Sequence, residues 1–104
     1  MAKKTKEPYR FIQSNQFERD LKRARSNPKQ VDATKEVWVF LELVRNGASL
    51  PAKYRNHPMS GDWDGWFDAH LEPDLVIIWR YKEHPEHGTI VVLQALGSHS
   101  YLGI

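Results

Sequence analysis

Histidine and aspartate side chains are concentrated between Tyr54 and Asp74, in the stretch YRNHPMSGDWDGWFDAHLEPD. His57 and His70 lie inside it, Asp74 closes it, and a third histidine, His99, lies near the C-terminus. The unperturbed pKa of imidazole is about 6.5, so histidine can take or give a proton near neutral pH. Cleavage of RNA without a metal needs a base for the 2′-hydroxyl proton and an acid for the leaving 5′-oxygen. We therefore treat the three histidines and Asp74 as candidate catalytic residues.

Cationic and aromatic side chains accompany these residues. Guanidinium and ammonium groups can hold a phosphate, and aromatic rings can stack on bases. The candidates for phosphate or RNA binding are Lys53, Arg55, Arg80, Trp63, Trp66 and Tyr101.

Other interpretations of the histidines remain open. A single histidine at a turn or strand end is commonly a polar surface residue. His84 and His87, in the stretch EHPEHG, are typical of a solvated hairpin loop. Three histidines and a carboxylate could instead bind zinc, but no two of them have the close helical spacing of familiar zinc motifs. We expect no metal and no cofactor.

Positive charge is concentrated in residues 1–30, although the whole chain carries a net charge of only +2. A basic helix can bind phosphates of any sequence because each neutralised phosphate releases counterions. A solvated helix face is the alternative. The candidates for contact with ribosomal RNA are Arg19, Lys22, Arg23 and Arg25.

Length and composition limit the class of protein. The chain has 104 residues, which suits one domain over residues 9–104 preceded by a flexible basic arm at residues 1–8. It has no cysteine, so disulfides and thiolate metal sites are excluded. No stretch has the length and apolar character of a membrane span or a secretion signal. We expect a cytoplasmic protein that does not interact with membranes.

The first half of the chain predicts a strand and two helices. Residues 9–12 have strand composition, and Ser14 can cap a helix that Asn27 and Pro28 end. Residues 31–46 predict a second helix that ends before Gly47. Its expected core stripe, at three- and four-residue spacing, consists of Val37, Trp38, Phe40, Leu41 and Val44.

The second half predicts strands at residues 65–71, 75–81 and 89–96, the last two rich in β-branched and aromatic residues. The order βααβββ indicates an α+β fold in which two N-terminal helices pack on one face of a four-stranded, mainly antiparallel sheet.

The turn at Glu72 and Pro73 sets the expected register of the first hairpin. It pairs His70 with Leu75, Asp68 with Ile77, and Trp66 with Trp79. Side chains alternate along a strand, so Trp66, Asp68 and His70 should line a cleft. The opposite set, expected in the core, is Phe67, Ala69, Leu71, Val76 and Ile78.

Several motifs, taken together, resemble one family. They are LPAKYRNHP at residues 50–58, GDW at 61–63, DAHLEPD at 68–74 and GSHSYL at 97–102. Their order and approximate spacing are similar to those of the YafQ branch of the RelE/ParE toxin superfamily. The resemblance covers most of the chain after the first helix, and it is specific as a combination.

The resemblance implies a toxin of a type II toxin–antitoxin module that acts as a metal-independent messenger RNA endoribonuclease on the ribosome. It implies a 2′,3′-cyclic phosphate or 3′-phosphate and a 5′-hydroxyl as products. By motif match, His57, His70, Asp74 and His99 correspond to the family's catalytic residues. It also implies a small DNA-binding antitoxin through which the complex would bind operator DNA.

One position departs from the family pattern. The family commonly has an aromatic residue four positions after its last histidine, where this chain has Gly103. Tyr101 is the candidate to replace it. A non-catalytic relative is the alternative function, either a DNA gyrase inhibitor or an RNA-binding or antitoxin-binding module.

Overall fold

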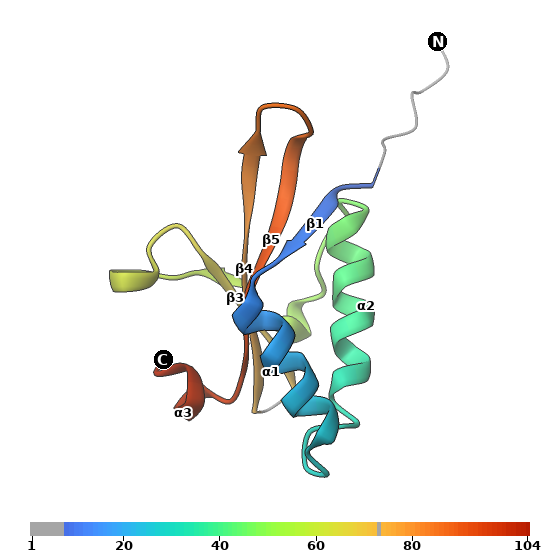
Figure 1. The fold of residues 1–104 in the computed structure, drawn as a ribbon, viewed down its shortest axis with the longest axis vertical. Coiled ribbons are helices and arrows are strands. Elements are labelled where there is room, and N and C mark those ends of the chain that lie inside the picture. The colour runs from blue at the N-terminus through green and yellow to red at the C-terminus, as the bar shows by residue number, and fades with distance from the viewer. Residues whose placement is uncertain (1–7, 73) are drawn as a thin grey trace.

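Among the residues that the structure describes, five strands form one mixed sheet in the order β1-β5-β4-β3-β2. Figure 1 labels β1, β5, β4 and β3. The structure, a computed structural model, describes residues 8–72 and 74–104, so the predicted basic arm lies outside the described residues except for Pro8. β1 runs parallel to β5, and the other neighbouring pairs are antiparallel. The strands are β1 (Arg10–Gln13), β2 (His57–Pro58), β3 (Phe67–Glu72), β4 (Leu75–His84) and β5 (Gly88–Gly97).

Helix α1 (Asn15–Ser26) begins at the predicted cap. The Ser14 hydroxyl oxygen accepts a hydrogen bond from the backbone N–H of Phe17 at 2.9 Å and donates one to the carbonyl of Gln94 at 2.6 Å. A cap of this kind satisfies one backbone donor of the first helical turn. Ser14 therefore starts the helix and also ties it to β5.

Helix α2 (Thr34–Arg45) begins later than predicted because residues 28–33 form turns. The core stripe is confirmed except for Trp38, which is 52% exposed. With 3.6 residues per turn, Trp38 lies about 100° around the helix from Val37. It therefore lies outside the stripe that Val37, Leu41 and Val44 define.

The helices and the sheet share one core. Phe17 and Leu21 of α1 pack with Val37 and Phe40 of α2 against strand residues that include Trp79. The α+β prediction is thus confirmed, whereas the predicted count of four strands is wrong. The extra strand is β2, and three short helices were also not predicted: η1 (Ala52–Tyr54), η2 (Gly61–Trp63) and α3 (His99–Leu102). None of the described helices is long and apolar enough to cross a lipid bilayer.

The predicted register of the β3–β4 hairpin is wrong by one residue. His70 pairs with Val76 and Asp68 pairs with Ile78, because the register shifts between His70 and Glu72. Phe67, Ala69 and Leu71 lie in the core as predicted, but the β4 residues beside them are Leu75, Ile77 and Trp79. A bulge places two residues of one strand opposite one residue of its partner. The side chains of β4 therefore point to the opposite faces from those predicted.

Candidate active site

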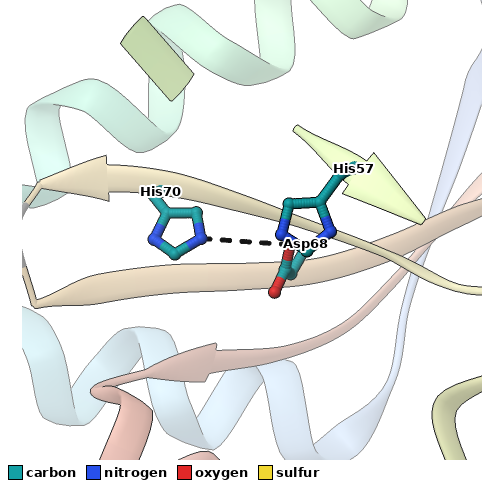
Figure 2. Close-up of side chains that lie close together, drawn as sticks. All are labelled: His57, Asp68 and His70. Carbon is teal, nitrogen blue, oxygen red and sulfur yellow. Dashed lines mark ion pairs between the residues drawn. The ribbon is translucent and has the colours of Figure 1, made fainter. Parts of the chain in front are cut away.

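His57, Asp68 and His70 lie together at the β2–β3 edge of the sheet, as Figure 2 shows. His57 is opposite Asp68 in the β2–β3 pair, and Asp68 and His70 share a face of β3. The Asp68 Oδ1 atom lies 3.0 Å from His57 Nε2 and 4.0 Å from His70 Nε2. The carboxylate therefore lies between two imidazoles.

The His57 ring is oriented by its other nitrogen. His57 Nδ1 lies 3.0 Å from the Pro58 carbonyl oxygen, which can only accept, so this nitrogen carries a proton. His57 Nε2 lies 3.0 Å from Asp68 Oδ1, which is an ion pair whenever the ring carries two protons. In that form the ring could act as an acid.

His70 is the most enclosed of the candidate histidines, with 13% of its side chain exposed. Burial lowers its pKa, and the nearby Arg55, His99 and His57 lower it further, against the opposing effect of Asp68. The Arg55 guanidinium lies 3.5 Å from His70 Nδ1 and can only donate, so neutral His70 carries its proton on Nε2. The free lone pair then lies beside a cation.

His99 also lies beside His70, with ring centroids 5.0 Å apart. The register explains this position, because His70 pairs with Val76, Val76 pairs with Gly97, and α3 begins two residues later. The Asp74 carboxylate lies 3.8 Å from His99 Nδ1. The structure thus brings His57, His70 and His99 together and places Asp74 beside His99.

Contacts to α1 fix the short helix α3. The Tyr101 hydroxyl donates a 2.7 Å hydrogen bond to Asp20 Oδ1, and Asp20 Oδ2 accepts the Leu96 N–H at 3.0 Å. The Arg23 guanidinium lies 4.0 Å from the centre of the Tyr101 ring and 3.1 Å from Asp20. We call Asp20, Arg23, Leu96 and Tyr101 the Asp20 clamp.

A surface depression of about 420 Å³ adjoins His57 and Asp68. Trp63 and Gly103 also line it. Trp63 lies edge-on to Trp66 at 6.1 Å. These groups form a concave surface beside the histidines.

The remaining cationic candidates are dispersed. Arg80 lies over the Trp66 ring at 5.2 Å, and the Lys53 ammonium lies 3.5 Å from Glu36 of α2. Arg23 belongs to the Asp20 clamp, whereas Arg19, Lys22 and Arg25 are exposed on α1. Lys53 therefore faces α2 rather than the histidine group.

Sequence reasoning did not select two carboxylates that organise the site. Asp68 was placed on the cleft face, but the pairing of β2 that brings His57 to it gives no sequence signal. Asp20 is 1% exposed within a basic helix. Its position three residues after Phe17, on the apolar stripe, was the signal that it points inward.

Solved structures that share this fold define the class of protein, which is a small bacterial toxin. The Escherichia coli DinJ–YafQ complex contains a chain with a TM-score of 0.70 and 30% identity, covering 90% of this chain and 97% of that chain. A metal-bound toxin from Helicobacter pylori has a TM-score of 0.69 and 28% identity, covering 90% of this chain and 98% of that chain.

Sequence comparison identifies the family within that class. The model of YafQ, a bacterial toxin of a type II toxin–antitoxin system, matches residues 9–103. The mRNA interferase toxin YafQ of Escherichia coli K12 is 36% identical over 70 residues, or 67% of this chain and 74% of that protein. The chain belongs to the YafQ family, which confirms the resemblance inferred from its motifs.

Proposed function

We propose that the chain is an endoribonuclease that cuts messenger RNA during translation, with the histidine group as its active site. The observation that carries this proposal is the placement of His57, His70 and His99 around Asp68 and Asp74. The mRNA interferase name of its relative supports the substrate. We expect the reaction to require no metal ion or cofactor.

His70 suits the base. Its lowered pKa favours the neutral ring near pH 7, and its lone pair on Nδ1 lies beside Arg55. A phosphate held by Arg55 would bring the adjacent ribose to that lone pair. His70 would then take the 2′-hydroxyl proton while the 2′-oxygen attacks phosphorus.

The acid must protonate the 5′-oxygen as its bond to phosphorus breaks. The rings of His57 and His99 both lie near His70, with centroids 6.1 and 5.0 Å from the His70 centroid. His57 is the stronger candidate because its Nε2 lies 3.0 Å from the Asp68 carboxylate, closer than any carboxylate lies to His99. The products would be a 2′,3′-cyclic phosphate and a 5′-hydroxyl.

The surroundings of the histidines suit RNA. Trp63 in the depression and Trp66 next to Arg80 could stack on bases. The exposed cations of α1, which are Arg19, Lys22 and Arg25, could hold ribosomal RNA. Tyr101 is half exposed, so one side of its ring remains open to a base.

We further propose that a small DNA-binding antitoxin binds this chain and that the complex binds operator DNA. The structure of a related toxin in complex with DinJ supports such a partner. The protein would act in the cytoplasm, where its messenger RNA substrate is translated.

Primer extension on a message during translation tests the activity. Wild-type protein should create new 5′ ends that His70→Gln and His99→Ala variants do not create. His87→Gln, at the tip of the β4–β5 hairpin, is the matched histidine control and should cut normally. Undiminished cleavage by folded His70→Gln and His99→Ala would refute the active-site assignment. DNA breaks without new RNA ends would indicate the gyrase-inhibitor alternative.

A further inference from the structure

Arg10 and Lys82 are cations to which the proposed active site gives no role. Arg10 lies in β1 and Lys82 in β4, and both are paired with Ile90 of β5 in the sheet. Residues that are directly opposite each other in neighbouring strands point to the same face of the sheet. Arg10, Ile90 and Lys82 therefore form a row across three strands on one face.

A second row lies two residues closer to the histidine group. Arg80 of β4 is opposite Val92 of β5, which is opposite Ile12 of β1. Side chains alternate along a strand, so both rows lie on the same face. The Arg80 guanidinium lies 5.2 Å from the centre of the Trp66 ring, which places Trp66 there as well. We call Arg10, Trp66, Arg80 and Lys82 the cationic sheet surface.

The cationic sheet surface is continuous with the histidine group. Asp68 is opposite Ile78 of β4, which is two residues from Arg80 and therefore on the same face. Lys82 is four residues beyond Ile78, which at about 3.3 Å per residue is roughly 13 Å along the strand. A nucleic-acid strand that leaves the histidines could therefore continue onto this surface without crossing an edge of the sheet.

Solvent reaches the cationic sheet surface. Figure 1 shows the β4–β5 hairpin extending beyond the ends of α1 and α2, with β1 alongside β5. Arg10 and Lys82 are exposed, and Ile12, two residues from Arg10 on the same face, is 47% exposed. Exposed apolar groups among cations suit single-stranded nucleic acid, which presents bases as well as phosphates.

Charge is segregated between the two faces of this part of the sheet. Glu83 lies on the opposite face, where it accepts a 2.7 Å hydrogen bond from the Thr89 hydroxyl, and Glu86 lies in the loop at the hairpin tip. From Arg80 to that tip, the described strand residues on the cationic face are all basic or neutral. They are Arg10, Ile12, Arg80, Lys82, His84, Gly88, Ile90 and Val92. This face therefore favours an anionic ligand.

The three cations of the surface have no carboxylate partner among the residues that the structure describes. Arg80 Nε donates to the backbone carbonyl of Tyr81 at 3.3 Å. The Arg and Lys side chains that do form ion pairs within the described chain are others, namely Arg23, Arg45 and Lys53. The charges of Arg10, Arg80 and Lys82 are thus available to an external anion.

We propose that the cationic sheet surface binds the messenger RNA strand that extends from the active site. Arg10, Arg80 and Lys82 contact phosphates, and Trp66 stacks on a base. Contacts to phosphates carry no sequence information, so the surface raises affinity for any message without setting the sequence that is cut. Only the identity of the strand as the substrate rests on the proposed function, because RNA binding at this surface does not require cleavage.

Binding of single-stranded RNA at several salt concentrations tests the surface. RNA of about 10 nucleotides with every 2′-hydroxyl methylated keeps its phosphates but cannot be cut by attack of the 2′-oxygen. Each phosphate contact on a single strand contributes about 0.7 to the slope of log K against log salt. The Arg10→Gln/Lys82→Gln double variant should therefore bind more weakly, with a slope smaller by about 1.4. An unchanged slope would overturn the proposal.

Lys35→Gln is the matched control for Lys82→Gln. Lys35 is exposed on α2 and forms no ion pair with a described residue, so its replacement removes the same charge away from the surface. Lys82→Gln alone should lower the slope by about 0.7, whereas Lys35→Gln should leave it unchanged. Equal effects of the two variants would show that binding follows net charge alone and would refute the site. Circular dichroism would check that both variants keep the fold.

Crosslinking on the translating ribosome identifies the bound RNA. Photoreactive benzoylphenylalanine in place of Ile12 leaves the three cations intact, and a His70→Gln background keeps the message uncut. The control carries the same group in place of Val39 of α2, which is 49% exposed. The group at position 12 should crosslink to the message, and the group at position 39 should not. Crosslinks to ribosomal RNA or protein alone, or no crosslink at position 12, would contradict the proposal.

Cleavage of an unmodified message by wild-type protein tests the proposed function separately. No cleavage together with a crosslink to the message would refute the proposed function and retain the binding surface. Cleavage without the crosslink and without the change in slope would retain the function and refute the surface.

Discussion

The Tyr101 hydroxyl donates a hydrogen bond to Asp20 across 81 positions of the chain, at 2.7 Å. Asp20 is 1% exposed, whereas the Tyr101 ring lies on the surface and is half exposed. The bond therefore connects a buried carboxylate of α1 to the helix that carries His99. Through this contact the N-terminal helix determines where a candidate catalytic residue lies.

Replacing Tyr101 by Phe should destabilise the protein by about 1–2 kcal/mol, because a hydrogen bond to a buried charge is lost. Cleavage should also fall, since α3 and His99 would be held less firmly. Urea unfolding and RNA cleavage would measure the two effects. Ser100→Ala, which changes an exposed side chain of the same helix, should alter neither. Equal stability of Tyr101→Phe and wild type would show that the hydrogen bond makes no net contribution.

Gly97→Ala should be destabilising because of Tyr101. A Cβ at Gly97 would lie 2.6 Å from Tyr101 Cδ2, which requires the ring to move. Overpacking of this kind typically costs about 1–3 kcal/mol.

A double-mutant cycle with Tyr101→Ala isolates this contact. Once the ring is removed, Gly97→Ala should cost much less. The same cost in both backgrounds would place the clash elsewhere, for example in the backbone of β5.

Local signals in the sequence predicted most helices and strands correctly. The prediction was wrong where contacts between residues far apart in the chain decide the structure. Ser14 and the spacing of Phe17 and Leu21 predicted α1 because caps and helical stripes depend on near neighbours. β2 has two residues, too few to show an alternation. β2 forms because its backbone pairs with the edge of β3, and this pairing places His57 opposite Asp68.

The register error has a similar cause. The shift between His70 and Glu72 changes the strand pairing by one residue, and no residue type in the turn specifies it. The faces of β3 were predicted correctly because they depend on alternation within one strand. The partners across the hairpin depend on the turn, so Trp79 was paired with Trp66 of the expected cleft face, although it is opposite Phe67 and stacks on it in the core.

Asn56 should contribute to stability through Trp79. The indole N–H of Trp79, which is 1% exposed, donates to Asn56 Oδ1 at 2.8 Å. Asn56→Ala leaves this donor unsatisfied, and we expect a loss of about 1–3 kcal/mol in thermal or urea unfolding. Asn56→Asp keeps the acceptor oxygen and should lose less. A larger loss with Asp than with Ala would indicate that another property of Asn56 matters.

Burial lowers the pKa of His70, which makes stability depend on pH. In the unfolded chain the His70 pKa returns to about 6.5. Between this value and the lower folded pKa, the unfolded state binds more protons, so stability falls as pH falls through this window. His70→Gln removes the group and should reduce the loss of stability below about pH 6.5. Unfolding midpoints at pH 5 and pH 8, as rough brackets of that window, would test it. Identical pH dependence in both proteins would contradict the assigned shift.

A substrate with sulfur in place of the bridging 5′-oxygen should identify the acid. A thiolate leaves without protonation, so loss of the general acid has little effect on this substrate, whereas loss of the base remains harmful. With His57 as the acid, His57→Ala should cut the sulfur substrate nearly as fast as wild type does, and His70→Gln should not. Rescue of His99→Ala in place of His57→Ala would assign the role of acid to His99.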